Sequence, residues 1–314
     1  MVEFTYVKKG LDALARAHRI NTMSGHLGAA VIAGYFIAEE HLQLDDAVYQ
    51  GITSELEGII AGGSVFSPRK GMHPTVAEMF EPTPIGRAVP EAIDDIAAAL
   101  DDNISRPIQS GHNVIFASIA LRALKDHPDL ATRPIVDGIR KLTEKFKGQT
   151  PGSGNYGKGK GRIDGRKIQL PETPAIQPYT TLEGMAEAVM DQLIAHASEE
   201  RQGYGGLWHI INHGAALTEL ANYGYRDIAL KGLKAHHQHM ELWKTLPDIS
   251  AEVENKAPAK HDPHTGDYWG DDLEHDRALL THRVKTIYGF DKLLELVKDP
   301  AKRHTAVLRM RYLM

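Results

Sequence analysis

Two histidines one helical turn apart are the residues best suited to do chemistry in this sequence. His209 and His213 lie in the stretch GLWHIINHGAALTEL, which begins at residue 206 and is otherwise largely apolar. Residues four positions apart share one face of an α-helix, so the two imidazole rings would point the same way. A helix that is apolar on nearly all sides is an inner helix. The pattern therefore predicts two imidazoles that project from an inner helix.

Imidazoles in this position support two kinds of reactive site. Neutral imidazole binds divalent transition metals, and His209 and His213 would form a three- or four-ligand site with one or two of His26, His112 and His282. The set His209, His213 and His112 is the one we name as the possible metal site, and one position left open would make it catalytic. Without a metal, the same rings act as general acids and bases, because their pKa lies near neutral pH. A third interpretation also stays open, in which the histidines only form structural hydrogen bonds at helix ends.

The composition excludes several classes of function. The 314 residues include 17 histidines but no cysteine, which excludes disulfides, thiolate nucleophiles and cysteine-ligated metals. The formal net charge of −5 and the lack of a long basic run argue against a nucleic-acid partner. No signal peptide is recognisable, and no segment has the roughly 18 apolar residues of a membrane span. We expect a cytoplasmic protein that binds a small apolar or aromatic molecule, and the sequence leaves open whether it forms a homo-oligomer.

Apolar residues spaced three and four positions apart predict helices through most of the chain. Alternating runs typical of strands are nearly absent. Two segments interrupt the pattern: a loop rich in proline and glycine at 62–90, with a short helix near 76–80, and a glycine-rich flap at 148–180. The helices are expected at residues 4–19, 26–41, 45–60, 91–100, 112–125, 129–146 or 132–146, 182–200, 206–222, 226–246, 273–298 and 301–313.

A short motif recurs ahead of two of these helices. Ser-Gly-His occurs at 24–26 and again at 110–112, and another histidine follows fifteen positions later in both copies. We interpret the helices that contain His213 and His282 as two further copies, and Ser24 as the N-cap of the first. The repeats predict a single all-α domain over residues 1–314, an α/α toroid or barrel built from irregular helical hairpins. His26, His112, His213 and His282 would then lie near the inner helix ends, around a central apolar cavity.

A second histidine cluster reads HHQH at residues 236–239. At least one of its three rings must face solvent if the segment is helical, because they lie within one turn. We therefore interpret the cluster as part of a solvated helix face.

At the histidine-bearing helices, the chain resembles the questin oxidase-like family, whose members are all-α proteins with several histidine-led helices. The motifs that carry the resemblance are Gly25-His26-Leu27, Gly111-His112, Trp208-His209 continuing through His213 to Ala216, and Thr281-His282-Arg283-Val284-Lys285. The resemblance implies a Baeyer–Villiger oxidation of an aromatic polyketide ketone, with molecular oxygen and NADPH as co-substrates.

From these observations we expect a small-molecule metabolic enzyme, an oxidoreductase of Baeyer–Villiger type acting on an aromatic or polyketide ketone. The residues expected to be catalytic are His26, His112, His213, His282 and Lys285, of which Lys285, one turn beyond His282, would orient an anionic group. Two alternatives stay open. One is a hydrolase or lyase on the same fold that depends on a histidine-bound metal, and the other is a non-catalytic helical binding or scaffold protein.

Overall fold

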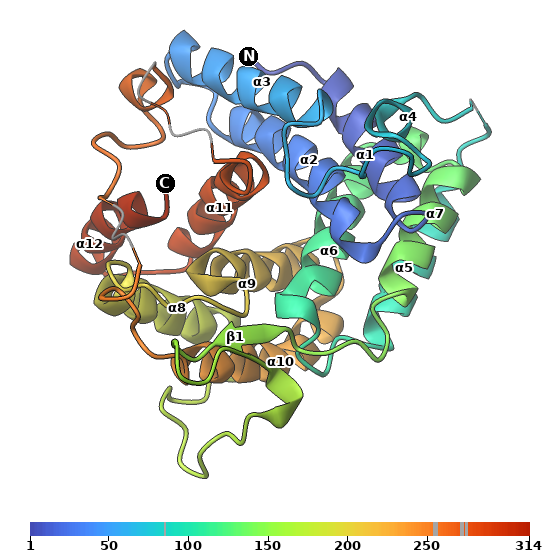
Figure 1. Cartoon of the computed structure of the whole chain (residues 1–314). Helices are drawn as coiled ribbons and strands as arrows, with labels where there is room; N and C mark the ends of the chain where they lie inside the picture. The colour runs from blue at the N-terminus through green and yellow to red at the C-terminus, as the bar shows by residue number, and fades with distance from the viewer. Residues whose placement is uncertain (85, 254–256, 271–272, 274–275) are drawn as a thin grey trace. The chain divides into compact units, whose positions relative to one another are not determined.

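A computed structural model describes residues 1–84, 86–253, 257–270, 273 and 276–314. The chain is all-α, as the sequence predicts: in this part it forms twelve α-helices and one small sheet (Figure 1). The short helix expected near 76–80 is α4 (Val76–Phe80). The sheet lies within the 148–180 segment, where β1 (Ser153–Asn155) and β2 (Arg162–Asp164) pair in antiparallel register. No strand was expected there, because strands of three residues are too short to show an alternating pattern.

The described residues form two compact units, each assembled from separate stretches of the chain. The boundaries between the units fall within two helices, α6 (His112–Asp126) and α11 (Leu279–Leu294). The single domain and the toroid or barrel concern the arrangement of the whole chain and stay predictions. Unit 1 consists of Met1–Asp101, Ile115–Phe146 and His261–Tyr288, and unit 2 of Asp102–Val114, Lys147–Lys260 and Gly289–Met314.

Unit 1 has α2 (Gly25–Glu40) as its most deeply buried helix. All residues from 25 to 34 are buried, because small and aliphatic side chains surround the helix axis. α2 packs against α1 and α3, and α1 also contacts α4 and α7. The other helices that lie wholly in this unit are α1 (Thr5–Ala17), α3 (Asp46–Ile60), α4, α5 (Ile93–Asp101) and α7 (Arg133–Glu144).

The close approach of α1 and α2 depends on a glycine. A Cβ atom added at Gly28 would lie 2.4 Å from the carbonyl oxygen of Gly10 and 2.7 Å from the backbone nitrogen of Leu14. Both of these atoms belong to the backbone of α1 and cannot move aside as a flexible side chain would. Gly28 therefore sets how closely the two helices pack.

Unit 2 is organised around α9 (Gly206–Asn222), the helix that contains His209 and His213. Residues 209 to 220 are all buried, which confirms the predicted inner helix. α9 packs against α8 (Leu182–His196) and α10 (Arg226–Lys244), and α8 contacts α12 (Pro300–Met310) (Figure 1).

The two Ser-Gly-His copies begin their helices differently. Ser24 has helical backbone angles and forms no side-chain cap, so its expected role as N-cap is wrong. A capping serine needs extended angles, and here Asn21 has them: its side chain accepts a hydrogen bond of 3.0 Å from the Ser24 N–H. In the second copy, the residues from 109 to 111 all have positive φ angles.

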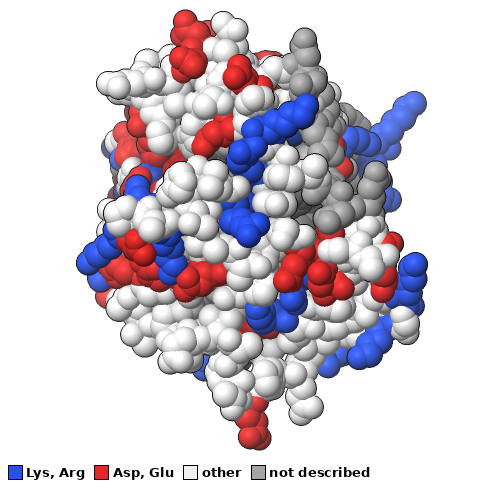
Figure 2. Space-filling view, turned by 90° about the vertical axis from the view of Figure 1, so that its left-hand side faces the viewer, with Lys and Arg blue, Asp and Glu red and all other residues white. Residues whose placement is uncertain are grey.

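No helix among the described residues is long and apolar enough to cross a membrane. On the face drawn in Figure 2, lysine and arginine side chains are interspersed with aspartate and glutamate side chains. This mixture agrees with the small formal net charge of the sequence.

Replacing Gly28 with alanine should destabilise the protein by about 2 kcal/mol, because the added methyl group forces α1 and α2 apart. Gly58→Ala in α3 is the matched control. A Cβ there would meet its nearest neighbour, Leu280, at 3.8 Å, so the better helix propensity of alanine should raise stability slightly. Urea unfolding, followed by circular dichroism, measures the free energy of unfolding of both variants. Equal midpoints for wild type and Gly28→Ala would contradict the packing argument.

Candidate functional site

In unit 1, the structure brings the side chain of Lys285 on α11 against His26 in the first turn of α2. Nζ of Lys285 forms a hydrogen bond with Nδ1 of His26, although 259 positions separate the two residues. Lys285 is 3% exposed and His26 is 1% exposed. Burial lowers the pKa of the Lys285 amine well below its usual value, and no charged group in the described part of the chain offsets this.

A lysine in this environment favours its neutral form. A neutral amine carries both N–H donors and a lone pair, which makes it a potential nucleophile or base. Its hydrogen bond with Nδ1 of His26 can run in either direction, depending on which ring nitrogen of His26 carries the proton. The pair therefore combines a reactive amine with an imidazole in direct contact.

Aromatic rings surround this pair. The His26 ring stacks on Phe66 with ring centroids 3.8 Å apart, and the edge of Phe116 lies 5.3 Å away. His282 contacts His26 at 4.9 Å between ring centroids, and its Nδ1 donates to the carbonyl oxygen of Ala278 at 2.7 Å. Three of the residues expected to be catalytic, at positions 26, 282 and 285, thus lie together in unit 1.

A buried ion pair anchors α11 beside them. Nη1 of Arg283 lies 2.6 Å from Oε1 of Glu55 on α3, and both side chains are almost completely buried. Nε of Arg283 also donates to the hydroxyl group of Tyr268 at 2.9 Å. The ion pair holds α11 against α3, and it thereby positions the residues on either side of Arg283.

In unit 2, His213 belongs to a chain of buried hydrogen bonds. Nε2 of His239 lies 2.7 Å from the carbonyl oxygen of Tyr204 and must donate to it. The neutral His239 ring then accepts at Nδ1, which lies 3.3 Å from Nδ1 of His213. The proton of His213 is therefore on Nδ1, and its Nε2 carries a lone pair. This Nε2 atom is buried and has no hydrogen-bond partner among the described residues.

Burial keeps these imidazoles uncharged. It lowers the pKa of His213 well below its usual value, and His236, His239 and His112 lower it further. Burial likewise lowers the pKa of His236 to about 3 and that of His239 to about 4. An uncharged imidazole with a bare lone pair can accept a proton or bind a metal ion. His213 meets this requirement.

The other two residues of the predicted metal site also lie in unit 2. The rings of His112 and His209 have centroids 4.4 Å apart. The turn before His112 packs on His213, since a Cβ at Gly111 would lie 2.5 Å from Cγ of His213. His112, His209 and His213 are thus all part of one unit, and metal binding by them stays a prediction.

The interpretation of the HHQH cluster as a solvated face is wrong for two of its three histidines. His236 is 0% exposed and His239 is 1% exposed. His236 donates from Nε2 to the carbonyl oxygen of Ile210 at 3.0 Å and accepts at Nδ1 from the hydroxyl of Tyr179 at 2.5 Å. The buried apolar residues Met240 and Trp243, one and two turns further along α10, carried a sequence signal that this face is internal.

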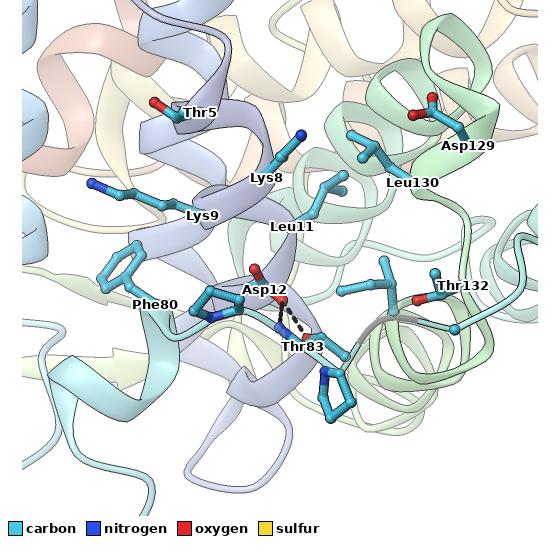
Figure 3. Close-up of a pocket in the computed structure, with 14 residues that line it drawn as sticks. Thr5, Lys8, Lys9, Leu11, Asp12, Phe80, Thr83, Asp129, Leu130 and Thr132 are labelled. Atoms are coloured by element: carbon cyan, nitrogen blue, oxygen red, sulfur yellow. Dashed lines mark hydrogen bonds between the residues drawn. The ribbon is translucent and has the colours of Figure 1, made fainter.

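A separate cavity of about 450 Å³ lies in unit 1 between α1, residues 80–84 and 86, and the 129–135 segment (Figure 3). Within it, the buried carboxylate of Asp12 accepts hydrogen bonds from the backbone N–H and the hydroxyl group of Thr83. None of the site residues expected from the sequence lines it. Its lining residues are Thr5, Lys8, Lys9, Leu11, Asp12, Phe80, Pro82, Thr83, Pro84, Gly86, Asp129, Leu130, Thr132 and Ile135.

No family model, no curated protein and no solved structure matches this chain. The resemblance to the questin oxidase-like family, and the oxidation that it implies, therefore stay predictions.

The buried histidines of unit 2 should make stability depend on pH. Their folded-state pKa values lie below the value near 6.5 of the unfolded chain, so the unfolded state binds more protons as the pH falls. Their contribution to stability is present above about pH 6.5 and is lost as the pH falls toward about 4. Replacing His239 with leucine removes one such group. The difference in unfolding free energy between wild type and this variant should shrink by about 2 kcal/mol from pH 7.5 to pH 5.

Urea unfolding of EDTA-treated protein at the two pH values measures this difference. A difference that is the same at both values would contradict the assignment of His239 as a neutral buried ring.

Proposed function

We propose that the chain is a small-molecule enzyme that acts on the carbonyl group of an aromatic or polyketide ketone, an oxidoreductase of Baeyer–Villiger type. The observation that supports the proposal is the buried hydrogen-bonded pair of Lys285 and His26 beside Phe66 and Phe116. A buried amine destabilises a protein unless it is neutral, so such groups occur more often at functional sites than in ordinary cores. The aromatic neighbours favour an apolar or aromatic ligand.

In the proposed reaction, Lys285 polarises the ketone. Its N–H donates to the carbonyl oxygen, which makes the carbonyl carbon more electrophilic and stabilises negative charge that develops on the oxygen. His26 forms the other hydrogen bond of the amine and holds it in place. His282, whose Nδ1–H is bonded to a backbone carbonyl, has Nε2 as its proton acceptor.

Molecular oxygen and NADPH enter the proposal through the family resemblance. One oxygen atom is inserted between the carbonyl carbon and a neighbouring carbon, giving an ester. The other oxygen atom leaves as water, with a hydride from NADPH and a proton from solvent.

Replacing Lys285 with methionine should lower the turnover number about 100-fold or more, because the carbonyl loses its hydrogen-bond donor. The methionine should fold well, since it replaces a buried amine with an apolar side chain of similar length. The assay follows NADPH oxidation with a panel of aromatic ketones and identifies the ester by mass spectrometry under isotopically labelled oxygen. Lys141→Met, an exposed lysine on α7, is the matched control and should retain full turnover.

Full turnover in the Lys285→Met variant would place the reaction elsewhere. If no ketone yields labelled ester with the wild-type protein, the proposal of a Baeyer–Villiger oxidation is wrong. Substrate conversion without oxygen and NADPH, abolished by EDTA, would instead favour a hydrolase or lyase with a metal held by His112, His209 and His213.

A second candidate function is the binding of a small apolar molecule without catalysis, and the cavity on α1 favours it. Aliphatic, proline and phenylalanine side chains line part of this cavity, and the exposed Lys8 is one of its polar lining residues. An amphipathic anion with an aromatic or aliphatic body would match both features. Anilinonaphthalene sulfonate is a fluorescent probe of this chemistry.

Replacing Leu130 with tryptophan should weaken probe binding about tenfold, because the larger ring fills part of the cavity. Leu308→Trp is the matched control, since Leu308 is already 48% exposed on α12 and lies outside the cavity. Fluorescence titration measures both affinities. Equal binding by the two variants would show that the probe does not occupy this cavity.

A further inference from the structure

Unit 2 contains a second amine bonded to an imidazole, apart from the histidines of α9. Lys244 is the last residue of α10, and His196 is the last residue of α8. Nζ of Lys244 lies 2.5 Å from Nε2 of His196, and Nδ1 of His196 lies 2.8 Å from Oε1 of Glu199. Hydrogen bonds thus connect a carboxylate to an imidazole, and the imidazole to an amine.

The direction of these hydrogen bonds is determined by chemistry. A carboxylate can only accept, so His196 donates its Nδ1–H to Glu199 and keeps a lone pair on Nε2. That lone pair accepts a hydrogen bond from the amine of Lys244. Glu199, His196 and Lys244 thus follow the arrangement of a catalytic triad. In that arrangement a carboxylate orients an imidazole, and the imidazole removes a proton from the nucleophile.

Arg201 holds the carboxylate in place. Its Nε donates to Oε2 of Glu199 at 2.6 Å, and its Nη1 donates to the carbonyl oxygens of Lys244 and Leu246. Burial raises the pKa of Glu199, but the hydrogen bonds from His196 and Arg201 outweigh it and keep the pKa below its usual value. Glu199 therefore remains an acceptor at neutral pH.

The amine of Lys244 is half-buried. No carboxylate in the described part of the chain forms an ion pair with Lys244, whose one hydrogen-bond partner there is His196. Partial burial and the nearby charge of Arg201 lower the pKa of Lys244, against the opposing effect of Glu199 and Glu241. The side chain remains partly exposed, so a reagent in solution can approach it.

We propose that Lys244 is a nucleophilic lysine that accepts an acyl group from an acyl thioester, with His196 as its general base and Glu199 as the residue that orients the base. The amine nitrogen forms a bond to the thioester carbonyl carbon, and the carbon–sulfur bond breaks. The proton of the amine passes to Nε2 of His196 and then to the departing thiolate. Glu199 stabilises the imidazolium that exists between these two transfers. The product is an amide at position 244.

Competitive acetylation by phenyl thioacetate tests the proposal on the full-length protein. Mass spectrometry measures the acetylation rate at each lysine, and Lys234, exposed on the same helix, is an internal reference. At pH 7.5 Lys244 should react at least about tenfold faster than Lys234. The ratio should fall toward one as the pH rises above about 10.5, where an ordinary lysine also loses its proton.

Two variants test the proposed roles of His196 and Glu199. His196→Gln removes the base, and Glu199→Gln removes the negative charge that stabilises it. Both should lower the rate at Lys244 several-fold while the rate at Lys234 and the circular dichroism spectrum stay unchanged. A wild-type rate at Lys244 no faster than at Lys234 would overturn the proposal, as would fast acetylation that persists in both variants.

Discussion

The position of the α11 segment in unit 1 depends on a buried ion pair between Arg283 and Glu55. Both side chains are almost fully buried, and Tyr268 supplies a further hydrogen bond to the guanidinium. A guanidinium left without a partner in this environment would cost several kcal/mol. The ion pair therefore links α11 to α3 at Arg283. His282 and Lys285 lie on the same helix within one turn of Arg283, so this link also constrains where they lie.

Two buried histidines of unit 2 form hydrogen bonds with backbone carbonyls. His239 donates to Tyr204, and His236 donates to Ile210, so one nitrogen of each ring is committed to the backbone. The second nitrogen must then act as an acceptor if the ring is neutral. Nδ1 of His239 therefore accepts the hydrogen bond from Nδ1–H of His213, which leaves Nε2 of His213 with a lone pair. The lone pair on His213 thus results from the hydrogen bond that His239 forms with the backbone of Tyr204.

Lys285 and Lys244 form the same kind of hydrogen bond but differ in how deeply they are buried. Each amine is hydrogen-bonded to an imidazole nitrogen, and neither forms an ion pair with a carboxylate of the described residues. An imidazole lone pair accepts a hydrogen bond but supplies no negative charge, so it compensates a buried ammonium less well than a carboxylate does. Burial then favours the neutral amine. Complete burial of Lys285 suits an enclosed reaction, whereas the partial exposure of Lys244 suits modification from solution.

Helical periodicity was sufficient to predict the all-α class and the buried helix of residues 206–222, because both depend on side chains close together in the sequence. The interpretation of the HHQH segment was wrong because the sequence does not say which face of α10 meets α9. Lys285 lies 259 positions from its partner His26, and Arg283 lies 228 positions from its partner Glu55. By itself, the sequence therefore determined the helices and the residue types that can react. Only the tertiary structure decided which of those residues are buried, paired and uncharged, because desolvation and long-range hydrogen bonds arise when distant segments pack.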